Sequence, residues 1–167
     1  MIIGVDIGRK NDHTALIMME GWQVVDLQIL PLGLQHHDIN DLIRAVVKPV
    51  DMVYIDQTGI GDSTVGELRR TNGEQINGVH LTGGDAIRSI GESTWYISKS
   101  KLLALLDRAI RETLIIQLPN DKAIALREQL TGMITHPNKT VGARLGQHDD
   151  AVIALALAVF GKIVEDL

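Results

Sequence analysis

The chain has 167 residues, of which 45% are apolar but only 3% aromatic, so its core must be built from aliphatic side chains. It contains no cysteine, which excludes disulfides and thiolate metal sites and is typical of a cytoplasmic protein. The net charge of −5 argues against a free-standing protein that binds nucleic acid through a basic surface. The same charge is compatible with an enzyme whose acidic centre is neutralised by bound metal.

The chain begins with apolar runs separated by turn signals. Residues 1–8, 13–20 and 22–32 predict three strands of an antiparallel meander, with Glu20 and Gly21 in one of its turns. Such a meander predicts one edge of a sheet and leaves the direction of later strands open.

A helix–strand alternation follows the meander. Apolar residues at helical spacing predict a helix over residues 38–50, which Asp38 caps and which closes near Pro49. The next predicted elements are a strand over 51–59, a helix over 61–70 with Asp62 or Ser63 as its N-cap, and a short strand over 76–84.

The last part of the chain predicts further helices and a hairpin. In order, these are an amphipathic helix over 98–114, an extended piece over 114–119, a helix over 121–133, a hairpin over 133–146 with its turn at Pro137 and Asn138, and an apolar helix that begins near His148 or Asp149. The whole pattern predicts an α/β fold. Its mixed five-stranded sheet has three antiparallel strands and then parallel ones, flanked by helices, with an extra C-terminal β-hairpin.

Length and hydropathy predict a single domain over residues 1–167 and no membrane span. No linker or repeat interrupts a chain of ordinary domain size. The longest apolar run, from Ala151 to Gly161, is shorter than the roughly 20 residues of a spanning helix. We therefore expect a soluble protein of the cytoplasm.

Acidic residues stand where apolar segments end. Asp6 ends the first predicted strand, Asp56 ends the fourth, and Asp149 and Asp150 open the final helix. Each alone could be a turn residue or a helix N-cap, the commonest role of Asp at a helix start. Carboxylates that converge at the carboxyl ends of strands repel one another unless a divalent cation compensates them, and Mg²⁺ and Mn²⁺ prefer oxygen ligands. The three positions together predict a metal site.

Other polar residues near these positions have two interpretations each. Asp12 and His13 would supply a further ligand or simply form a polar loop. His148 would contact a metal or a phosphate, or lie on the surface at a helix start. Lys99 and Lys101, at the head of the amphipathic helix, would face a phosphate backbone or be solvated.

Two absent motifs narrow the class of enzyme. The chain has no G-x-x-x-x-G-K-[ST] sequence, which excludes a P-loop ATPase. It has neither a G-x-S-x-G elbow nor a cysteine, which excludes the hydrolases that depend on these nucleophiles.

Four segments together resemble the C-terminal nuclease domain of the phage terminase large subunit. They are GVDIGRKNDHTALIMM, VYIDQTGIGDSTVGELRR, WYISKSKLLALLDRAI and LGQHDDAVIALALAV. Their order and spacing match that family, and together they reach nearly the whole chain. The resemblance implies an RNase H-like fold and a metal-dependent endonuclease that cuts concatemeric viral double-stranded DNA during packaging.

The resemblance also implies roles for individual residues. Asp6, Asp56 and Asp150 match the catalytic metal ligands, Asp150 through its Asp-x-x-x-Ala-Leu-Ala spacing. Asp149 is the neighbour that could replace Asp150, and Asp12 matches an accessory acidic position of some members.

Basic and imidazole side chains complete the predicted site. Lys101 matches the basic residue at the head of the amphipathic helix in that family. The predicted DNA-contacting residues are Lys99, Lys101, Arg9 and Lys10, and the predicted accessory residues are His148 and His13.

The mechanism expected from this set uses two Mg²⁺ or Mn²⁺ ions about 3.5–4 Å apart. Asp6 would bridge them, with Asp56 and Asp150 at either side. One ion would activate a water for in-line attack and the other would stabilise the leaving 3′ oxygen, with little sequence preference because backbone contacts position DNA without specifying its sequence.

The family also implies partners. A full terminase subunit carries an ATPase domain ahead of its nuclease and works with a small terminase subunit and a portal in the host cytoplasm. This chain begins directly at the predicted nuclease strand, so it is expected to be either an excised domain or a stand-alone protein.

Two other functions stay open at the level of sequence. A RuvC-like Holliday-junction resolvase shares the fold and the terminal acidic helix. The segment GVDIGRKNDHTAL also resembles the phosphate loop of sugar-kinase and actin-like nucleotide-binding domains, although that fold normally needs two such domains.

Overall fold

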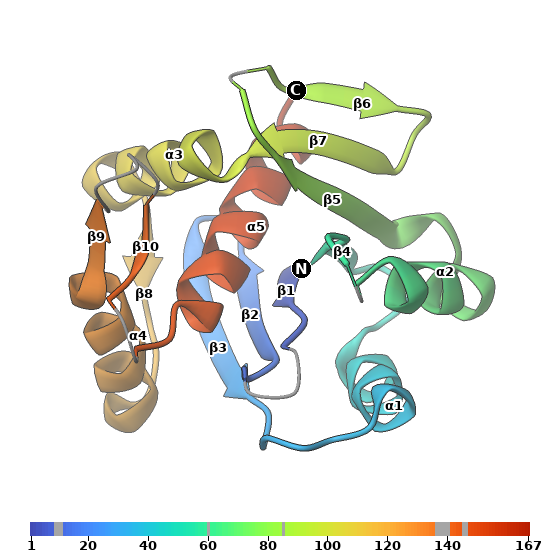
Figure 1. Cartoon of the computed structure of the whole chain (residues 1–167), viewed down its shortest axis with the longest axis horizontal. Helices are drawn as coiled ribbons and strands as arrows, with labels where there is room; N and C mark the ends of the chain where they lie inside the picture. The colour runs from blue at the N-terminus through green and yellow to red at the C-terminus, as the bar shows by residue number, and fades with distance from the viewer. Residues whose placement is uncertain (9–11, 60, 85, 136–140, 145–146) are drawn as a thin grey trace.

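A mixed eight-stranded sheet forms the centre of the computed structural model, which describes residues 1–8, 12–59, 61–84, 86–135, 141–144 and 147–167 (Figure 1). The strand order is β6-β7-β5-β4-β1-β2-β3-β8. The strands are β1 Ile2–Asp6, β2 Ala15–Glu20, β3 Gln23–Ile29, β4 Met52–Asp56, β5 Ile76–Thr82, β6 Arg88–Ile90, β7 Thr94–Ser98 and β8 Ile115–Ile116.

Helices cover both faces of this sheet, and a separate hairpin lies beside it. The helices are α1 His36–Val46, α2 Gly61–Asn72, the 3₁₀ turn η1 Gly73–Gln75, α3 Lys99–Glu112, α4 Asn120–Gly132 and α5 Asp150–Glu165. The hairpin strands are β9 Met133–Thr135 and β10 Val141–Ala143, and they pair antiparallel as predicted. Its predicted turn at Pro137 and Asn138 lies outside the described residues.

The predicted meander and the parallel strands after it are confirmed. β1 pairs antiparallel with β2, and β2 with β3, while β4 and β5 continue the sheet parallel to β1. The predicted five strands thus form the middle of the sheet, but the sheet is wider than predicted, because β7, β6 and β8 extend its edges. The added β6 and β8 have three and two residues, and such short strands exist through pairing with a neighbour rather than through their own pattern.

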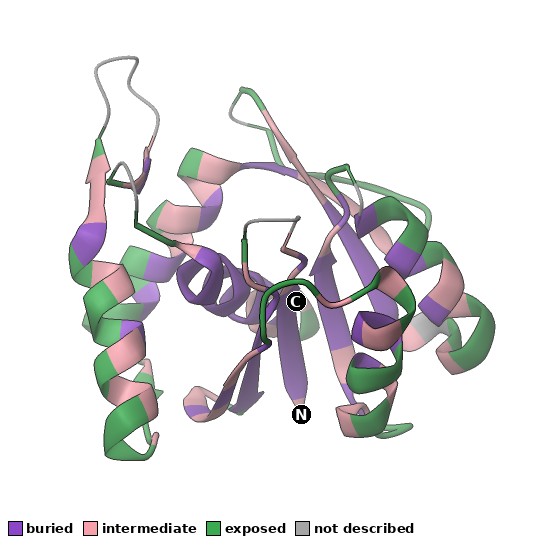
Figure 2. Ribbon diagram, turned by 60° about the horizontal axis from the view of Figure 1, so that its bottom comes forward, coloured by how far each residue is buried: buried purple, intermediate pink, exposed green. Residues whose placement is uncertain are grey.

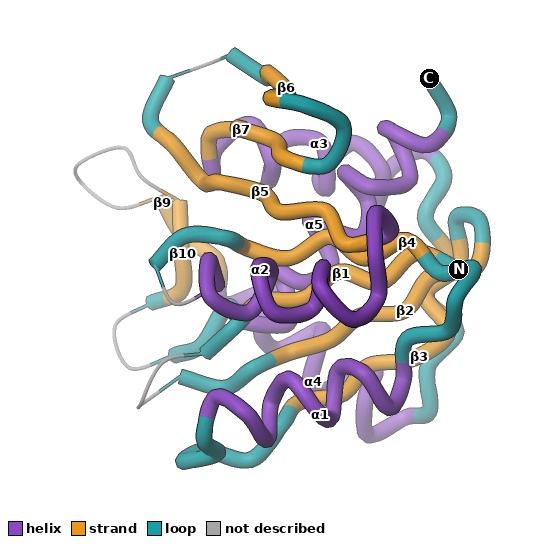
Figure 3. The backbone as a smooth tube through the Cα atoms, turned by 90° about the vertical axis from the view of Figure 1, so that its right-hand side faces the viewer, coloured by secondary structure: helices purple, strands orange, loops and turns teal. Residues whose placement is uncertain are grey.

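The two faces of the sheet form two apolar layers. One layer joins α1 and α2 to the sheet through side chains such as Ile43, Leu68 and Ile3 (Figure 3). The other is centred on α5, which is buried from its first residue through Gly161 and packs mainly on β1 and β2 (Figure 2). A helix that is apolar on every side requires such a position, because it has no face suited to water.

Small residues let α5 approach β1 closely. A Cβ placed on Gly4 would lie 2.0 Å from the carbonyl oxygen of Ala154 and 2.5 Å from the backbone nitrogen of Ala158. Likewise, a Cβ on Gly161 would lie 2.4 Å from the ring of Tyr54 on β4. The helix backbone therefore rests directly on the strand backbone, and its first turn is fixed relative to the end of β1.

Three helix starts differ in detail from the prediction. The helix α2 begins at Gly61, so Asp62 and Ser63, predicted as its N-cap, lie inside its first turn. The N-cap of α1 is Gln35, and Asp38 stabilises the start from the third helical position, where its carboxylate accepts a hydrogen bond from the Gln35 backbone N–H at 3.2 Å. The helix α5 begins at Asp150 with Asp149 as its N-cap residue, but the Asp149 side chain makes no capping hydrogen bond. Among the described residues, no helix has the length and apolar character needed to cross a bilayer.

Candidate metal centre

Three separate elements bring their carboxylates to one cavity at the carboxyl ends of the central strands. Asp6 ends β1 and Asp56 ends the neighbouring parallel strand β4, so both lie at the same edge of the sheet. The close packing of α5 on β1 brings Asp149 and Asp150 to that edge as well. The cavity has a volume of about 250 Å³ and is lined by Asp6, Ile7, Gly8, Asp12, Asp56, Thr58, Gln147, His148, Asp149 and Asp150.

Asp6 has the most perturbed environment of these carboxylates. Burial raises its pKa well above the ordinary value, and the negative charges of Asp56, Asp150 and Asp149 raise it further. Lys99 opposes this effect only in part. A carboxylate in this position is costly to ionise unless a cation is added, as expected for a residue shared between metal ions.

Asp56 is oriented by the turn that follows β4. Its Oδ1 accepts a hydrogen bond from the backbone N–H of Thr58 at 2.8 Å, and the Thr58 hydroxyl accepts one from the backbone N–H of Leu81 on β5 at 3.1 Å. Burial raises the pKa of Asp56, while the Thr58 hydrogen bonds and the charges of Lys99 and His80 lower it. Thr58 thus orients one carboxylate oxygen of Asp56 and connects it, through the hydrogen bond to Leu81, to β5.

Asp150 carries a buried oxygen without a partner. Its Oδ2 makes no hydrogen bond although it has lost contact with solvent, and His148 Nδ1 lies 3.6 Å away, beyond hydrogen-bond distance. Burial raises the pKa of Asp150, as do the charges of Asp12 and Asp149, whereas His148 and a backbone hydrogen bond from His13 lower it. An unpaired buried carboxylate oxygen is unfavourable in the metal-free protein.

Asp149 is held differently from its neighbour. Its Oδ2 accepts a hydrogen bond and ion pair from Lys99 Nζ at 2.8 Å, which joins the start of α3 to the start of α5. The Lys99 ammonium also lies close enough to lower the pKa of both Asp6 and Asp56. The predicted basic residue therefore lies at the site, but in contact with a carboxylate rather than in open solvent.

The structure brings two of the remaining predicted residues to the cavity and a third beside them. Asp12 and His148 line it, and the His148 ring packs edge-on against His13 with centroids 5.4 Å apart. His13 is itself fixed by its Nδ1, which lies 2.8 Å from the carbonyl oxygen of Leu30. Lys101 is not among the lining residues, and Arg9 and Lys10 lie outside the described residues.

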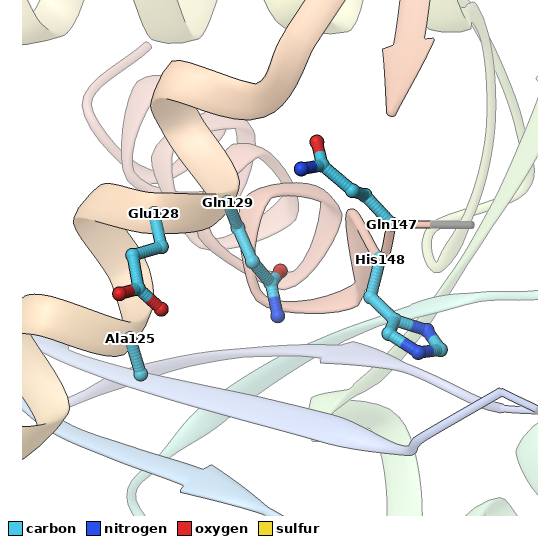
Figure 4. A pocket seen from close by; sticks show the side chains of 5 residues that line it. All are labelled: Ala125, Glu128, Gln129, Gln147 and His148. Carbon is cyan, nitrogen blue, oxygen red and sulfur yellow. The ribbon is translucent and has the colours of Figure 1, made fainter. Parts of the chain in front are cut away.

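A second pocket, of about 320 Å³, adjoins the carboxylate cavity through two shared lining residues, Gln147 and His148 (Figure 4). Gln129 projects into this region from α4, and its Oε1 accepts a hydrogen bond from the backbone N–H of Ala151 at 2.8 Å. This contact satisfies one of the free N–H groups in the first turn of α5 and so fixes the turn that carries Asp150. The sequence analysis did not identify Gln129, Gln147 or Thr58, because nothing in a single sequence pairs them with residues far along the chain.

The donor set fits a divalent cation by its chemistry. It consists of carboxylates at strand and helix ends, one of which has an unpartnered buried oxygen. Within the part of the chain that the structure describes, however, no three Asp, Glu or His side chains are yet close enough to coordinate one ion. The carboxylates line one cavity and repel one another, and a bound cation would offset this repulsion.

The Asp6 carboxylate should make the stability of the metal-free protein depend on pH. Because its folded-state pKa is raised, this contribution is fully present below the unfolded pKa of about 3.9 and is lost as pH rises through the folded pKa. We expect the free energy of unfolding of the wild type, relative to Asp6→Asn, to fall by up to about 1.4 kcal/mol per pH unit in that window. Urea unfolding in EDTA at several pH values measures this difference. A difference that stays constant with pH would contradict the described environment of Asp6.

Comparison with solved structures shows which known proteins share this fold. The large terminase nuclease from thermophilic phage G20c with bound magnesium superposes with a TM-score of 0.66 at 20% identity, over 95% of this chain and 79% of that one. The chain has the fold of a large terminase nuclease domain. A mutant nuclease domain of the large terminase subunit of bacterial virus Sf6, with manganese and beta-thujaplicinol, gives a TM-score of 0.66 at 14% identity, over 95% of this chain and 86% of that one.

The same fold assignment follows from a third structure. The G20c nuclease with bound zinc gives a TM-score of 0.60 at 21% identity, over 94% of this chain and 78% of that one. No protein-family model and no curated protein matches the chain. The predicted RNase H-like α/β fold of the terminase nuclease is thereby confirmed, on likeness of structure at low sequence identity.

Proposed function

We propose that this chain is a divalent-metal-dependent endonuclease that cuts double-stranded DNA with little sequence specificity. The observation that carries this proposal is the convergence of Asp6, Asp56 and Asp150 on one cavity. The likeness in fold to terminase nucleases solved with bound magnesium, zinc and manganese supports it. We propose further that the activity serves viral genome packaging, together with a terminase ATPase domain, a small terminase subunit and a portal.

In the proposed mechanism Asp6, Asp56 and Asp150 would hold two divalent ions, Mg²⁺ or Mn²⁺. The Thr58 backbone N–H orients Asp56, and Asp150 offers a buried oxygen that accepts no hydrogen bond. When bound, the ions lower the pKa of an attacking water and stabilise the leaving 3′ oxygen, which gives 5′-phosphate and 3′-hydroxyl ends. The closely packed β1 and α5 hold the backbone of Asp6 and Asp150 in place.

The third ligand in this proposal is Asp150 rather than Asp149. Asp150 presents a buried oxygen that accepts no hydrogen bond and has only the His148 Nδ1 at 3.6 Å, whereas the Asp149 oxygen is already neutralised by Lys99 at 2.8 Å. Asp149 then acts as a positioning residue, which keeps the Lys99 ammonium beside Asp6 and Asp56. A fixed ammonium there suits a phosphate that bears extra charge in the transition state.

Substituting the two neighbouring aspartates separately should distinguish these roles. We expect Asp150→Asn to lose both DNA cleavage and the rise in melting temperature that Mn²⁺ causes. A ligand at a hundred times its Kd adds about 2.7 kcal/mol of stability, so the effect is measurable by thermal denaturation. Asp149→Asn should keep the Mn²⁺ stabilisation and lower kcat with little change in the Mn²⁺ concentration required. The reverse pattern would assign the ligand to Asp149.

The proposed function is tested directly on supercoiled plasmid. The purified chain should nick and linearise plasmid DNA with Mn²⁺ or Mg²⁺, lose this activity in EDTA, and regain it when metal is restored. End-labelling of the products should show 5′-phosphates. A chain that shows no metal-dependent cleavage and no metal-dependent stabilisation would overturn the proposal.

Substrate shape separates the proposal from its nearest alternative. A junction-resolving nuclease would cleave a four-way junction much faster than a linear duplex of the same sequence, whereas the proposed enzyme should cut both at comparable rates. Calorimetry with ATP provides a second comparison, since a nucleotide-binding domain would bind ATP in the absence of DNA.

A further inference from the structure

A row of three side chains crosses the open face of β5, β7 and β6. His80 on β5 is paired in register with Tyr96 on β7, and Tyr96 with Arg88 on β6. Residues directly opposite one another in neighbouring strands point to the same face, so the three side chains form one row about 10 Å long. We call this set the His80–Tyr96–Arg88 row.

The row has a defined stacking geometry. The rings of His80 and Tyr96 stack with centroids 4.6 Å apart at an angle of 19° between their planes. The guanidinium carbon of Arg88 lies 4.8 Å from the Tyr96 ring centroid, a cation–π distance. Because β7 is the middle strand, Tyr96 has His80 on one side and Arg88 on the other, which leaves neither ring face free for a nucleobase.

The row lies at the same end of the sheet as the carboxylate cavity. β4, β5 and β7 run parallel, and Asp56 at the end of β4 is paired with Val79, the residue before His80. Successive residues of a strand point to opposite faces, so His80 and the row lie on the α2 face, whereas Asp56 and Val79 point to the α5 face. A duplex that contacts both the row and the cavity would therefore pass over the end of the sheet that they share.

In the part of the chain that the structure describes, the row is not covered by a helix. α2 lies over the opposite end of this face, where Arg69 donates hydrogen bonds to the carbonyl oxygen of Ile76 at 3.0 Å and the hydroxyl of Thr94 at 3.2 Å (Figure 3). β6 and β7 extend beyond α2, so Arg88 is exposed and Tyr96 is only half-buried. Among the described residues, no ion pair involves Arg88, in contrast to Arg44, Arg108 and Arg111.

We infer that the His80–Tyr96–Arg88 row binds the phosphate backbone of duplex DNA beside the cleavage site. This inference rests on the proposed nuclease function and adds the surface that holds the substrate. The aromatic ring fixes the plane of the guanidinium, whose in-plane N–H donors suit two phosphate oxygens. An exposed arginine that pairs with no carboxylate of the described residues supplies, on an otherwise acidic protein, the charge complementarity that phosphate requires.

The test measures DNA affinity in a background that cannot cleave. Fluorescence anisotropy of a labelled 30-base-pair duplex with the Asp6→Asn protein gives the Kd at several salt concentrations. Adding Arg88→Gln should weaken binding about tenfold, the loss of one charged hydrogen-bonded contact. It should also reduce the slope of log K against log salt concentration by about 0.9. Tyr96→Leu should weaken binding similarly, and Tyr96→Phe should retain it because the ring remains.

Two controls keep the outcome unambiguous. Arg108→Gln removes another exposed arginine, one paired with Glu112 on α3, and should leave the Kd and the salt slope unchanged. Circular dichroism melting checks that each variant is folded. Equal affinity and equal salt slope for Arg88→Gln and its parent would overturn the inference, as would weaker binding without a change in slope. If the wild-type chain cleaves plasmid but Arg88→Gln binds normally, only this inference fails; if the wild type neither cleaves nor binds DNA, the proposed function fails.

Discussion

Asp6→Asn is expected to reduce metal-dependent cleavage about a thousandfold or more, equivalent to about 4 kcal/mol in the activation barrier. Asp6 is the carboxylate whose pKa is raised most, first by burial and then by three neighbouring aspartates. In the proposed mechanism it would hold the divalent ions together with Asp56 and Asp150, so that its loss removes a ligand. Initial rates of plasmid cleavage at saturating Mn²⁺ measure the effect.

The same substitution should not unfold the metal-free protein. An amide of similar size removes a buried charge from a repulsive cluster, so the free energy of unfolding in EDTA at neutral pH should stay equal or rise. Asp107→Asn is a matched control, because Asp107 is an exposed carboxylate paired with Arg111 on α3 and should keep full activity. An Asp6→Asn protein that cleaves at the wild-type rate would show that the β1 carboxylate is not a ligand.

Gly4→Ala is expected to be the most destabilising methyl addition in the central sheet, at about 3 kcal/mol or more. The new Cβ would lie 2.0 Å from the carbonyl oxygen of Ala154 and 2.5 Å from the backbone nitrogen of Ala158. Both atoms belong to the α5 backbone, so the whole helix must move away from β1. Urea unfolding followed by circular dichroism gives the change in free energy.

This substitution should also impair the site itself. Moving α5 separates Asp150 from Asp6, so cleavage and Mn²⁺ stabilisation should fall even in the fraction that remains folded. Gly66→Ala is the control, since Gly66 is exposed within α2 and a Cβ there meets no other atom. It should stabilise the protein by about 0.5–1 kcal/mol. A Gly4→Ala protein with the wild-type unfolding midpoint would contradict the close packing of α5 on β1.

The sequence by itself determined the order of the main elements and the positions of the acidic residues. Apolar runs with period-two or helical spacing marked β1 to β5 and the larger helices, because those side chains must be buried whatever their partners are. The apolar stretch after Asp150 likewise required a fully enclosed helix. The aspartates that end these apolar segments were identifiable as candidate site residues. A carboxylate next to an apolar core is unfavourable unless a hydrogen bond or an opposite charge compensates it.

Only the tertiary structure decided which of these groups meet and how each is held. The short strand β8 exists through pairing with the distant β3, β6 through pairing with its neighbour β7, and the His80–Tyr96–Arg88 row through strand register. The difference between Asp149 and Asp150 is also tertiary, since Lys99, fifty residues earlier in the chain, neutralises one and not the other. The spacing of apolar and polar residues along the sequence shows which side chains must be buried. Charge pairing and hydrogen bonding depend on neighbours that come together only when the chain folds.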